Sequence, residues 1–198
     1  MMTPDLVVAV ETPPDAAARI VTLADVKAHL RIEHASEDGL LGVYLDAAHA
    51  HVEAQTSFAM RVTQYAASLT GFPASGRIDL PWPPLKTVDG VAYVDVDGVT
   101  QELDASLYSV VKRGSAAAVV LKPSAAWPET AEGPEAVVVT WTSGLDPDDK
   151  RLDAARHAVR LVAAHFYANR EATSDKPPGL VPHAVDALLT PYRQTGWI

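Results

Sequence analysis

The chain has 198 residues, of which 48% are hydrophobic, and it carries a formal net charge of −9 and no cysteine. This length and composition predict one domain, or one domain with a sizeable insertion, that can bury a real core. Without thiols, disulfides and thiolate metal sites are excluded, which fits a reducing cytoplasm. Apolar runs such as Ala116–Leu121 are too short to cross a bilayer, so no membrane partner is expected.

The acidic balance bears on nucleic-acid binding. Ordinary DNA binding relies on basic side chains that neutralise phosphates, and a charge of −9 argues against it. The charge remains compatible with a surface that DNA slides past without sticking. Simple acidic solubility is the plainer explanation.

The N-terminal region is expected to be an extended arm followed by two helices. Residues 1–20 have few structure signals, and Met1–Asp15 lacks the basic segment of a signal peptide. Thr22 is a predicted N-cap, with Asp25 at the capping-box position, for a short helix over Leu23–Arg31. Ser36 is expected to cap a second helix ending near Thr56. Its apolar face would hold Leu40, Leu41, Tyr44, Leu45, Ala48 and Val52, with Asp46, His49 and Glu53 off that face.

From Arg61 onward the apolar period becomes that of strands. Asp97-Gly98 predicts a tight hairpin turn, and Gly114-Ser115 predicts a second one. Leu80–Leu85 contains three prolines and is expected to be a rigid, extended crossing segment. The expected strands are Arg61–Leu69, Val88–Val96, Val99–Leu103, Tyr108–Lys112, Ala117–Lys122 and Glu135–Thr142.

Helices return near the C-terminus. Pro147 and Asp148-Asp149 indicate the start of a long helix over Asp149–Ala172. A short helix over Pro182–Leu189 is expected to end at Pro191. The two helical blocks each have an apolar face too wide to leave in water, so we expect them to pack together.

These elements predict an α+β fold, with a helical core of two long helices plus short ones and a β-rich insertion between its N-terminal and C-terminal parts. The expected division is an N-terminal arm (1–20), the first helical part of the core (21–60), the β-rich insertion (61–144), the second helical part (145–190) and a C-terminal tail (191–198).

No motif in the sequence requires catalysis, a cofactor or a metal. Gly-rich phosphate loops and a nucleophile elbow are missing. His49 and His51 point to different helix faces, and His157 and His165 are two turns apart, so none forms the i, i+4 pair of a zinc helix. Asp95–Gly98 resembles the start of a calcium loop but lacks the later carboxylates, and a hairpin turn explains it better.

Two features suggest contacts with other molecules. Arg156 and Arg160 lie one turn apart beside His157, and they would either pair with acidic residues of the same chain or face a neighbouring subunit. The C-terminal tail carries Trp197 and Ile198, which would fold back on the core or anchor a partner.

Taken together, several segments resemble tailed-phage head–tail connector (adaptor) proteins and their relatives in gene transfer agents. The resemblance covers roughly Val21 to Arg193. Its segments are Val21–Ile32, Glu37–Leu41, Ala47–Glu53, Gly71–Pro73, Leu80–Pro84, Tyr93–Gly98, Trp127-Pro128, Ala154–Glu171 and Leu188–Arg193.

The resemblance implies a structural subunit in the virion or phage-like particle, assembled in the bacterial cytoplasm. Such proteins form a homo-oligomeric ring, typically of twelve copies, between the portal and the stopper or tail-completion protein, and double-stranded DNA passes through the lumen. It further implies a portal-docking tail made of Tyr192, Arg193, Gln194, Thr195, Gly196, Trp197 and Ile198. Arg156, His157 and Arg160 are candidates for subunit contacts, although no family motif assigns them that role.

The alternative is a small cytoplasmic hydrolase-like enzyme with a site between the helices and the β insertion. His157 or His165 would be its acid or base. Deletion of the tail after Leu189 would abolish assembly of a connector, whereas loss of the histidines would abolish the activity of an enzyme.

Overall fold

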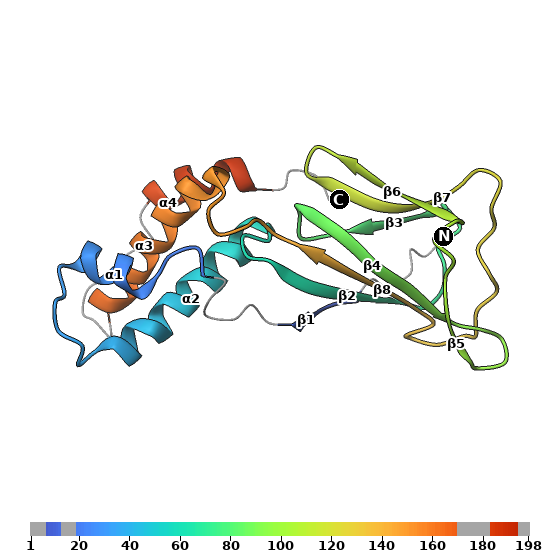
Figure 1. Cartoon of the computed structure of the whole chain (residues 1–198), viewed down its shortest axis with the longest axis horizontal. Coiled ribbons are helices and arrows are strands. Elements are labelled where there is room, and N and C mark those ends of the chain that lie inside the picture. Colours follow the sequence, from blue (N-terminus) through green and yellow to red (C-terminus); the bar gives the residue numbers. More distant parts are fainter. Residues whose placement is uncertain (1–6, 13–18, 170–182, 194–198) are drawn as a thin grey trace. The chain divides into compact units, whose positions relative to one another are not determined.

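The computed structural model describes residues 7–12, 19–169 and 183–193, and it shows an α+β fold (Figure 1). The chain divides into two compact units. A β-rich unit comprises Met1–Pro14 and Val62–Gly144, and a helical unit comprises Asp15–Arg61 and Leu145–Ile198. The predicted fold class is confirmed: helices from both ends of the chain build one core, and the β-rich segment lies between them in sequence.

The helical unit contains α1 (Leu23–Leu30), α2 (Asp38–Thr56), α3 (Asp153–Ala168) and α4 (His183–Leu189). Short 3-10 turns at Lys150–Leu152 and Thr190–Tyr192 precede α3 and follow α4. The expected packing of the two helical blocks is confirmed, because α2 and α3 contribute to one apolar cluster together with α1 and α4. Its fully buried members include Leu41, Leu45, Leu152, Val159 and Leu189.

The start of α1 is the predicted capping box. Thr22 Oγ1 accepts the backbone N–H of Asp25, and the Asp25 carboxylate accepts the backbone N–H of Thr22. The backbone N–H and the hydroxyl of Thr22 both donate to the Asp25 carboxylate, and these two hydrogen bonds lower the pKa of that carboxyl below its usual value. The predicted cap of α2 was wrong. That helix begins at Asp38, and the Ser36 hydroxyl bonds to His34 Nδ1 instead of capping it.

His49 is a second correction, because it lies on the buried face of α2 and is only 1% exposed. Its Nδ1 donates to the Leu45 carbonyl at 2.8 Å, which satisfies one ring nitrogen. Burial lowers the pKa of the imidazole to about 4, so the ring is neutral at pH 7. The helical spacing places residue 49 beside Leu45 and Val52, and this periodicity outweighs the polar character of the side chain.

The end of α2 is joined to the following segment through a largely buried ion pair. The Glu53 carboxylate accepts both the guanidinium of Arg61 and the backbone N–H groups of Met60 and Arg61. The two charged side chains are 13% and 10% exposed. Glu53, predicted to lie off the apolar face, therefore fixes the path by which the chain leaves α2.

The β-rich unit holds two antiparallel sheets. The five-stranded sheet has the order β1 (Val7–Thr12), β2 (Thr63–Leu69), β8 (Val137–Ser143), β4 (Leu85–Val94) and β5 (Thr100–Glu102). The three-stranded sheet has the order β3 (Arg77–Leu80), β7 (Ala116–Leu121) and β6 (Tyr108–Arg113). The strands β1 and β3 are additions to the elements expected from the sequence.

Both predicted hairpins are present. β4 and β5 pair through Val94 and Thr100, and Gly98 adopts a φ of 79° that its missing Cβ permits. β6 and β7 pair in an uninterrupted register from Tyr108 with Leu121 to Arg113 with Ala116. No strand occupies residues 81–84, between the end of β3 and the start of β4. The segment is not the extended crossing that was predicted, because residues 82–84 form a bend in which Trp82 has a φ of 60°.

Aromatic stacking organises the interior of the β-rich unit. The Tyr65 ring lies between Trp82 and Trp141, with ring centroids 5.8 and 5.7 Å away. Trp141 on the central strand β8 is fully buried. A second stack joins Phe72 to Trp127, whose Nε1 donates to the Pro73 carbonyl and so holds the β7–β8 loop.

Candidate assembly surfaces

The cationic residues of α3 are paired within the chain. Arg156 donates to the Asp153 carboxylate and to the Pro147 carbonyl, and its side chain is only 15% exposed. Arg160 lies 4.0 Å from the Asp25 carboxylate of α1. Of the three predicted subunit-contact residues, His157 is the exposed one. Pairing inside the chain therefore accounts for both arginines, and their role in a subunit contact stays a prediction.

The start of the predicted docking tail belongs to the helical unit. The Tyr192 side chain is 7% exposed, packs edge-on against Phe58 with ring centroids 5.4 Å apart, and donates its hydroxyl to the Arg151 carbonyl. Burial raises the pKa of the Tyr192 phenol. Arg193 pairs with Asp186 of α4 at 2.7 Å. Residues 194–198, with Trp197, lie outside the described residues, so Tyr192 and Arg193 are the part of the tail whose position is known.

Exposed valines mark two places on the β-rich unit. Val96 and Val99 flank the β4–β5 turn and are 64% and 52% exposed. Val110 and Val111 are neighbours on β6, each 41% exposed. The first pair adjoins the Asp97-Gly98 turn, so the sequence contained a signal for it, whereas the exposure of β6 follows from its position at a sheet edge.

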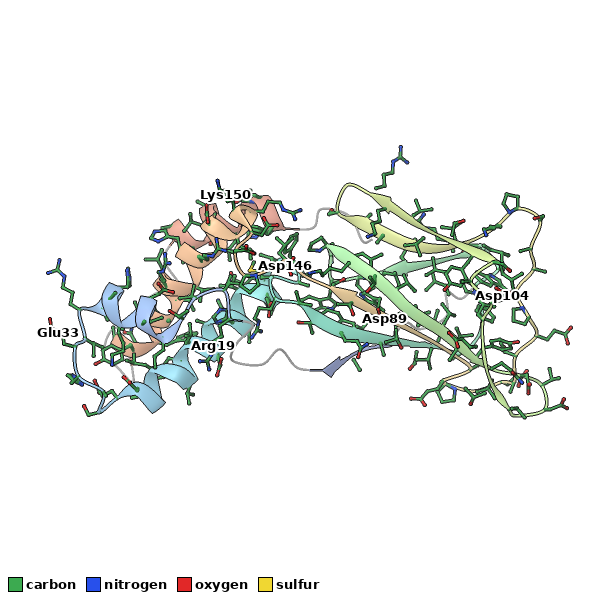
Figure 2. All side chains as sticks on the ribbon, viewed as in Figure 1. Arg19, Glu33, Asp89, Asp104, Asp146 and Lys150 are labelled. Carbon is green, nitrogen blue, oxygen red and sulfur yellow. The ribbon has the colours of Figure 1, made fainter. Side chains whose placement is uncertain are left out.

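A polar cluster surrounds Asp89 of β4 (Figure 2). Its carboxylate accepts hydrogen bonds from Gln64 of β2, Thr87 of β4 and Thr142 of β8. Although partial burial raises the pKa of Asp89, these hydrogen bonds outweigh it and the net pKa is lowered. Asp89 also lines an open groove with Glu102 and Thr140. Because neutral donors stabilise the charged carboxylate, the cluster is suited to holding three strands together and not to proton transfer.

The described histidines belong to no group of side chains that could hold a metal ion. His165 Nδ1 lies 3.3 Å from the amide nitrogen of Asn169, on α3. Within the described residues, no group of three or more His, Asp or Glu side chains could hold a metal ion. No helix in the same part of the chain is long and apolar enough to cross a membrane.

Comparison with known families and structures connects this geometry to one class of protein. Residues 20–97 match the model of the phage gp6-like head-tail connector protein family. This segment includes the capping box of α1, all of α2 and the strands β2, β3 and β4. Comparison with curated protein sequences finds no match.

Three solved structures share the fold over nearly the whole chain. A chain in the neck of an empty GTA particle, computed with C6 symmetry, superposes with a TM-score of 0.80 and 25% identity, covering 97% of each chain. A chain in the virion of a native gene transfer agent (GTA) particle gives a TM-score of 0.76 and 25% identity, covering 96% of this chain and 97% of the other. A chain in the neck of a native GTA particle, computed with C12 symmetry, gives 0.76 and 23% identity over 97% of each chain.

The resemblance to head–tail connector (adaptor) proteins of tailed phages and gene transfer agents is thereby confirmed. The protein has a structural role, and the enzyme alternative is rejected, because the matching family consists of structural connector proteins.

Proposed function

We propose that this chain is a subunit of a homo-oligomeric ring in the neck of a phage or gene transfer agent particle, where it connects the portal to the stopper or tail. The observation that carries the proposal is the match to a chain in a GTA particle neck, which covers 97% of both chains at a TM-score of 0.80. Because both units take part in that match, the proposal concerns the whole chain and not the helical unit alone.

The symmetry of the matched particles supports a ring of twelve copies. The neck structures were computed with C6 and C12 symmetry. Rotational symmetry of this kind requires two different, complementary surfaces on each subunit, since each copy contacts the next head to tail.

The acidic charge supports a passage for double-stranded DNA without sequence-specific binding. A net charge of −9 disfavours adhesion of the phosphate backbone, which a DNA-gripping ring would promote with basic side chains. The net negative charge therefore favours a channel through which DNA passes over a ring that binds the DNA backbone.

The tail from Tyr192 to Ile198 is the proposed contact with the portal. The described part supports this assignment in one respect: Tyr192 bonds to the turn before α3 and Arg193 pairs with Asp186 of α4, so the start of the tail is fixed to the helical unit. A partner held by the tail would thus be held by the helical core.

The test is a pull-down of the tagged full chain from particle-producing cells, followed by negative-stain imaging of the eluate. We expect portal protein and ring-shaped particles, and we expect their loss when residues after Arg193 are deleted. The variant ending at Arg193 keeps the Tyr192 anchor, so its fold is preserved as a control for the docking step. A monomer without any head or tail protein in the eluate would contradict the proposal.

A further inference from the structure

The edge strand β6 is a regular sheet edge with exposed apolar side chains in its middle and two basic side chains at its end. Natural proteins protect edges with bulges, short strands or charges. Here β1 carries a register shift before Thr12, β5 has three residues, and β3 has four residues with an Arg77–Asp79 ion pair. By contrast, β6 has six residues in an unbroken ladder with β7, and its exposed side chains include two valines. Such an edge is suited to contact with another chain.

The tip of the β4–β5 hairpin is a second apolar surface, and it is held rigidly. One Asp95 carboxylate oxygen accepts the backbone N–H groups of Asp97 and Val99, and the other accepts the Gln101 amide. This arrangement presents Val96 and Val99 to solvent in a fixed geometry. Because the tip is preorganised, little conformational entropy would be lost when it binds.

The two surfaces carry opposite charges. The hairpin tip has Asp97, and the adjoining loop contributes the exposed Glu129, Glu132 and Glu135; this loop is bonded to the hairpin through Ala131 and Ala136, which pair with Val94. β6 ends in Lys112 and Arg113, and Lys112 is fixed by the carbonyls of Leu85 and Lys86. Figure 1 shows the hairpin tip and the β6–β7 turn at opposite ends of the β-rich unit.

We infer that the β4–β5 hairpin tip of one copy binds the β6 edge of the adjacent copy in the ring. The occupant is a second copy of this chain, because one chain supplies both an acidic apolar surface and a basic apolar surface. Two distinct complementary surfaces are what a head-to-tail contact requires. Opposite charges at the rim would set the register. Val96 and Val99 would be desolvated against one of the two β6 valines, whose side chains point to opposite faces of the strand. This inference rests on the proposed ring.

Engineered cysteines test the contact directly, since the chain has none of its own. Two double variants, Val96→Cys with Val111→Cys and Val99→Cys with Val110→Cys, are expressed in particle-producing cells, and the rings recovered by the pull-down are oxidised with copper phenanthroline, because the thiols stay reduced in the cytoplasm. All four positions are exposed, so the substitutions leave the fold intact. A disulfide forms only when the two Cα atoms lie within about 7 Å of each other. We expect one of the pairs to give a ladder of covalent oligomers on a non-reducing gel.

The matched control pairs Val43→Cys with Val111→Cys, because Val43 of α2 is as exposed as Val96, at 64%. It should give no ladder, and each single variant should give at most dimers. Rings without a ladder from either test pair would overturn the inference while leaving the connector function standing. Failure to recover rings or portal from the wild-type chain would instead remove the proposed function, and this contact with it.

A charge exchange provides an independent measurement. Asp97→Lys and Arg113→Glu should each reduce the yield of rings several-fold, and the double variant should restore most of it, because the two charges then attract again across the contact. Glu129→Lys makes the same charge change on the neighbouring loop and should have a smaller effect than Asp97→Lys. A double variant as poor as the two single variants would overturn the pairing of these charges.

Discussion

The helical unit and the β-rich unit differ in the side chains that they expose at their surfaces. Charged side chains of the helical unit are mostly paired within it: Arg19 with Asp46, Lys27 with Asp38 and Arg156 with Asp153. Figure 2 shows Arg19 on the segment that precedes α1. The β-rich unit instead carries four of the six large hydrophobic residues that are exposed in the described parts of the chain.

The interiors of the two units also differ. Aliphatic side chains from four helices fill the helical core, together with Met60 and Tyr192. In the β-rich unit, stacked rings of Tyr65, Trp82 and Trp141 join the strand β2, the proline-rich segment and the strand β8. We conclude that the helical unit is built to hold its own shape, whereas the β-rich unit also presents surfaces suited to binding.

The largest expected effect is that of Trp141→Ala in the β-rich unit. Removing a fully buried indole from the ring stack should cost about 3–5 kcal/mol of folding free energy. Trp197 belongs to the helical unit and is replaced by Phe in both proteins, so that the remaining tryptophans are all in the β-rich unit. Urea unfolding would be followed by tryptophan fluorescence, which then reports the β-rich unit, and by circular dichroism at 222 nm, which reports the helices. We expect the fluorescence midpoint to fall further than the helical midpoint. Equal shifts of both midpoints would show that the two units unfold as one.

In the helical unit, Glu53→Ala should lower the free energy of unfolding more than any other substitution of a charged residue considered for that unit. The change leaves the Arg61 guanidinium and two backbone N–H groups without the carboxylate that accepts them. Loss of one partner of a largely buried pair costs on the order of 3 kcal/mol. Urea unfolding measured at 222 nm checks this value. Arg151→Ala, which breaks a pair whose arginine is 68% exposed, is the control and should cost less than about 1 kcal/mol.

Acid should destabilise the helical unit through His49. Its pKa is lowered to about 4 in the fold, against about 6.5 when unfolded, so the unfolded chain binds more protons between these values. The contribution of neutral His49 to the free energy of unfolding is therefore fully present above pH 6.5. It is lost as the pH drops from 6.5 to 4, by up to about 1.4 kcal/mol per pH unit. Urea midpoints across this range measure the slope.

His49→Leu is expected to flatten most of that slope, because it removes the titrating ring from the buried face of α2. The exposed His157→Gln serves as the control and should leave the slope as it is in the wild type. If the urea midpoint of His49→Leu falls with pH as steeply as that of the wild type, then other groups cause the acid sensitivity.

The smallest expected effect is that of Thr22→Ala. This substitution removes the side chain that accepts the Asp25 backbone N–H in the capping box of α1. Loss of an N-cap costs about 1 kcal/mol, which thermal unfolding of the full chain can resolve. Thr100→Ala on the exposed strand β5 is the control and should change the midpoint less.

Local chemistry explains which elements could be predicted from sequence. Gly98 and Gly114 predict their hairpins correctly, because each turn needs a residue with a positive φ. The spacing of Thr22 and Asp25 predicts the start of α1, because these two residues form the reciprocal hydrogen bonds of a capping box. Ser36 failed as a cap because its hydroxyl had a competing local partner in His34. The four-residue strand β3 was missed because it is short and stops at Pro81.

The assembly surfaces were harder to predict than the fold. For Arg156 and Arg160 the sequence left two interpretations open, pairing within the chain or contact with a neighbouring subunit. Their partners in the structure are Asp153, which lies three residues before Arg156 on α3, and Asp25, which only the packing of α1 beside α3 brings near Arg160. The exposed valines of β6 could not be told from core valines, because exposure depends on which strand ends the sheet. Only the family resemblance, and not the local pattern, indicated a ring.

The most direct test of the central claim is the native mass of the ring recovered with the portal from particle-producing cells. One chain has a mass of 21.1 kDa. We predict a closed assembly of twelve chains, as the proposed ring requires. Chains recovered only as monomers, without portal, would contradict the account.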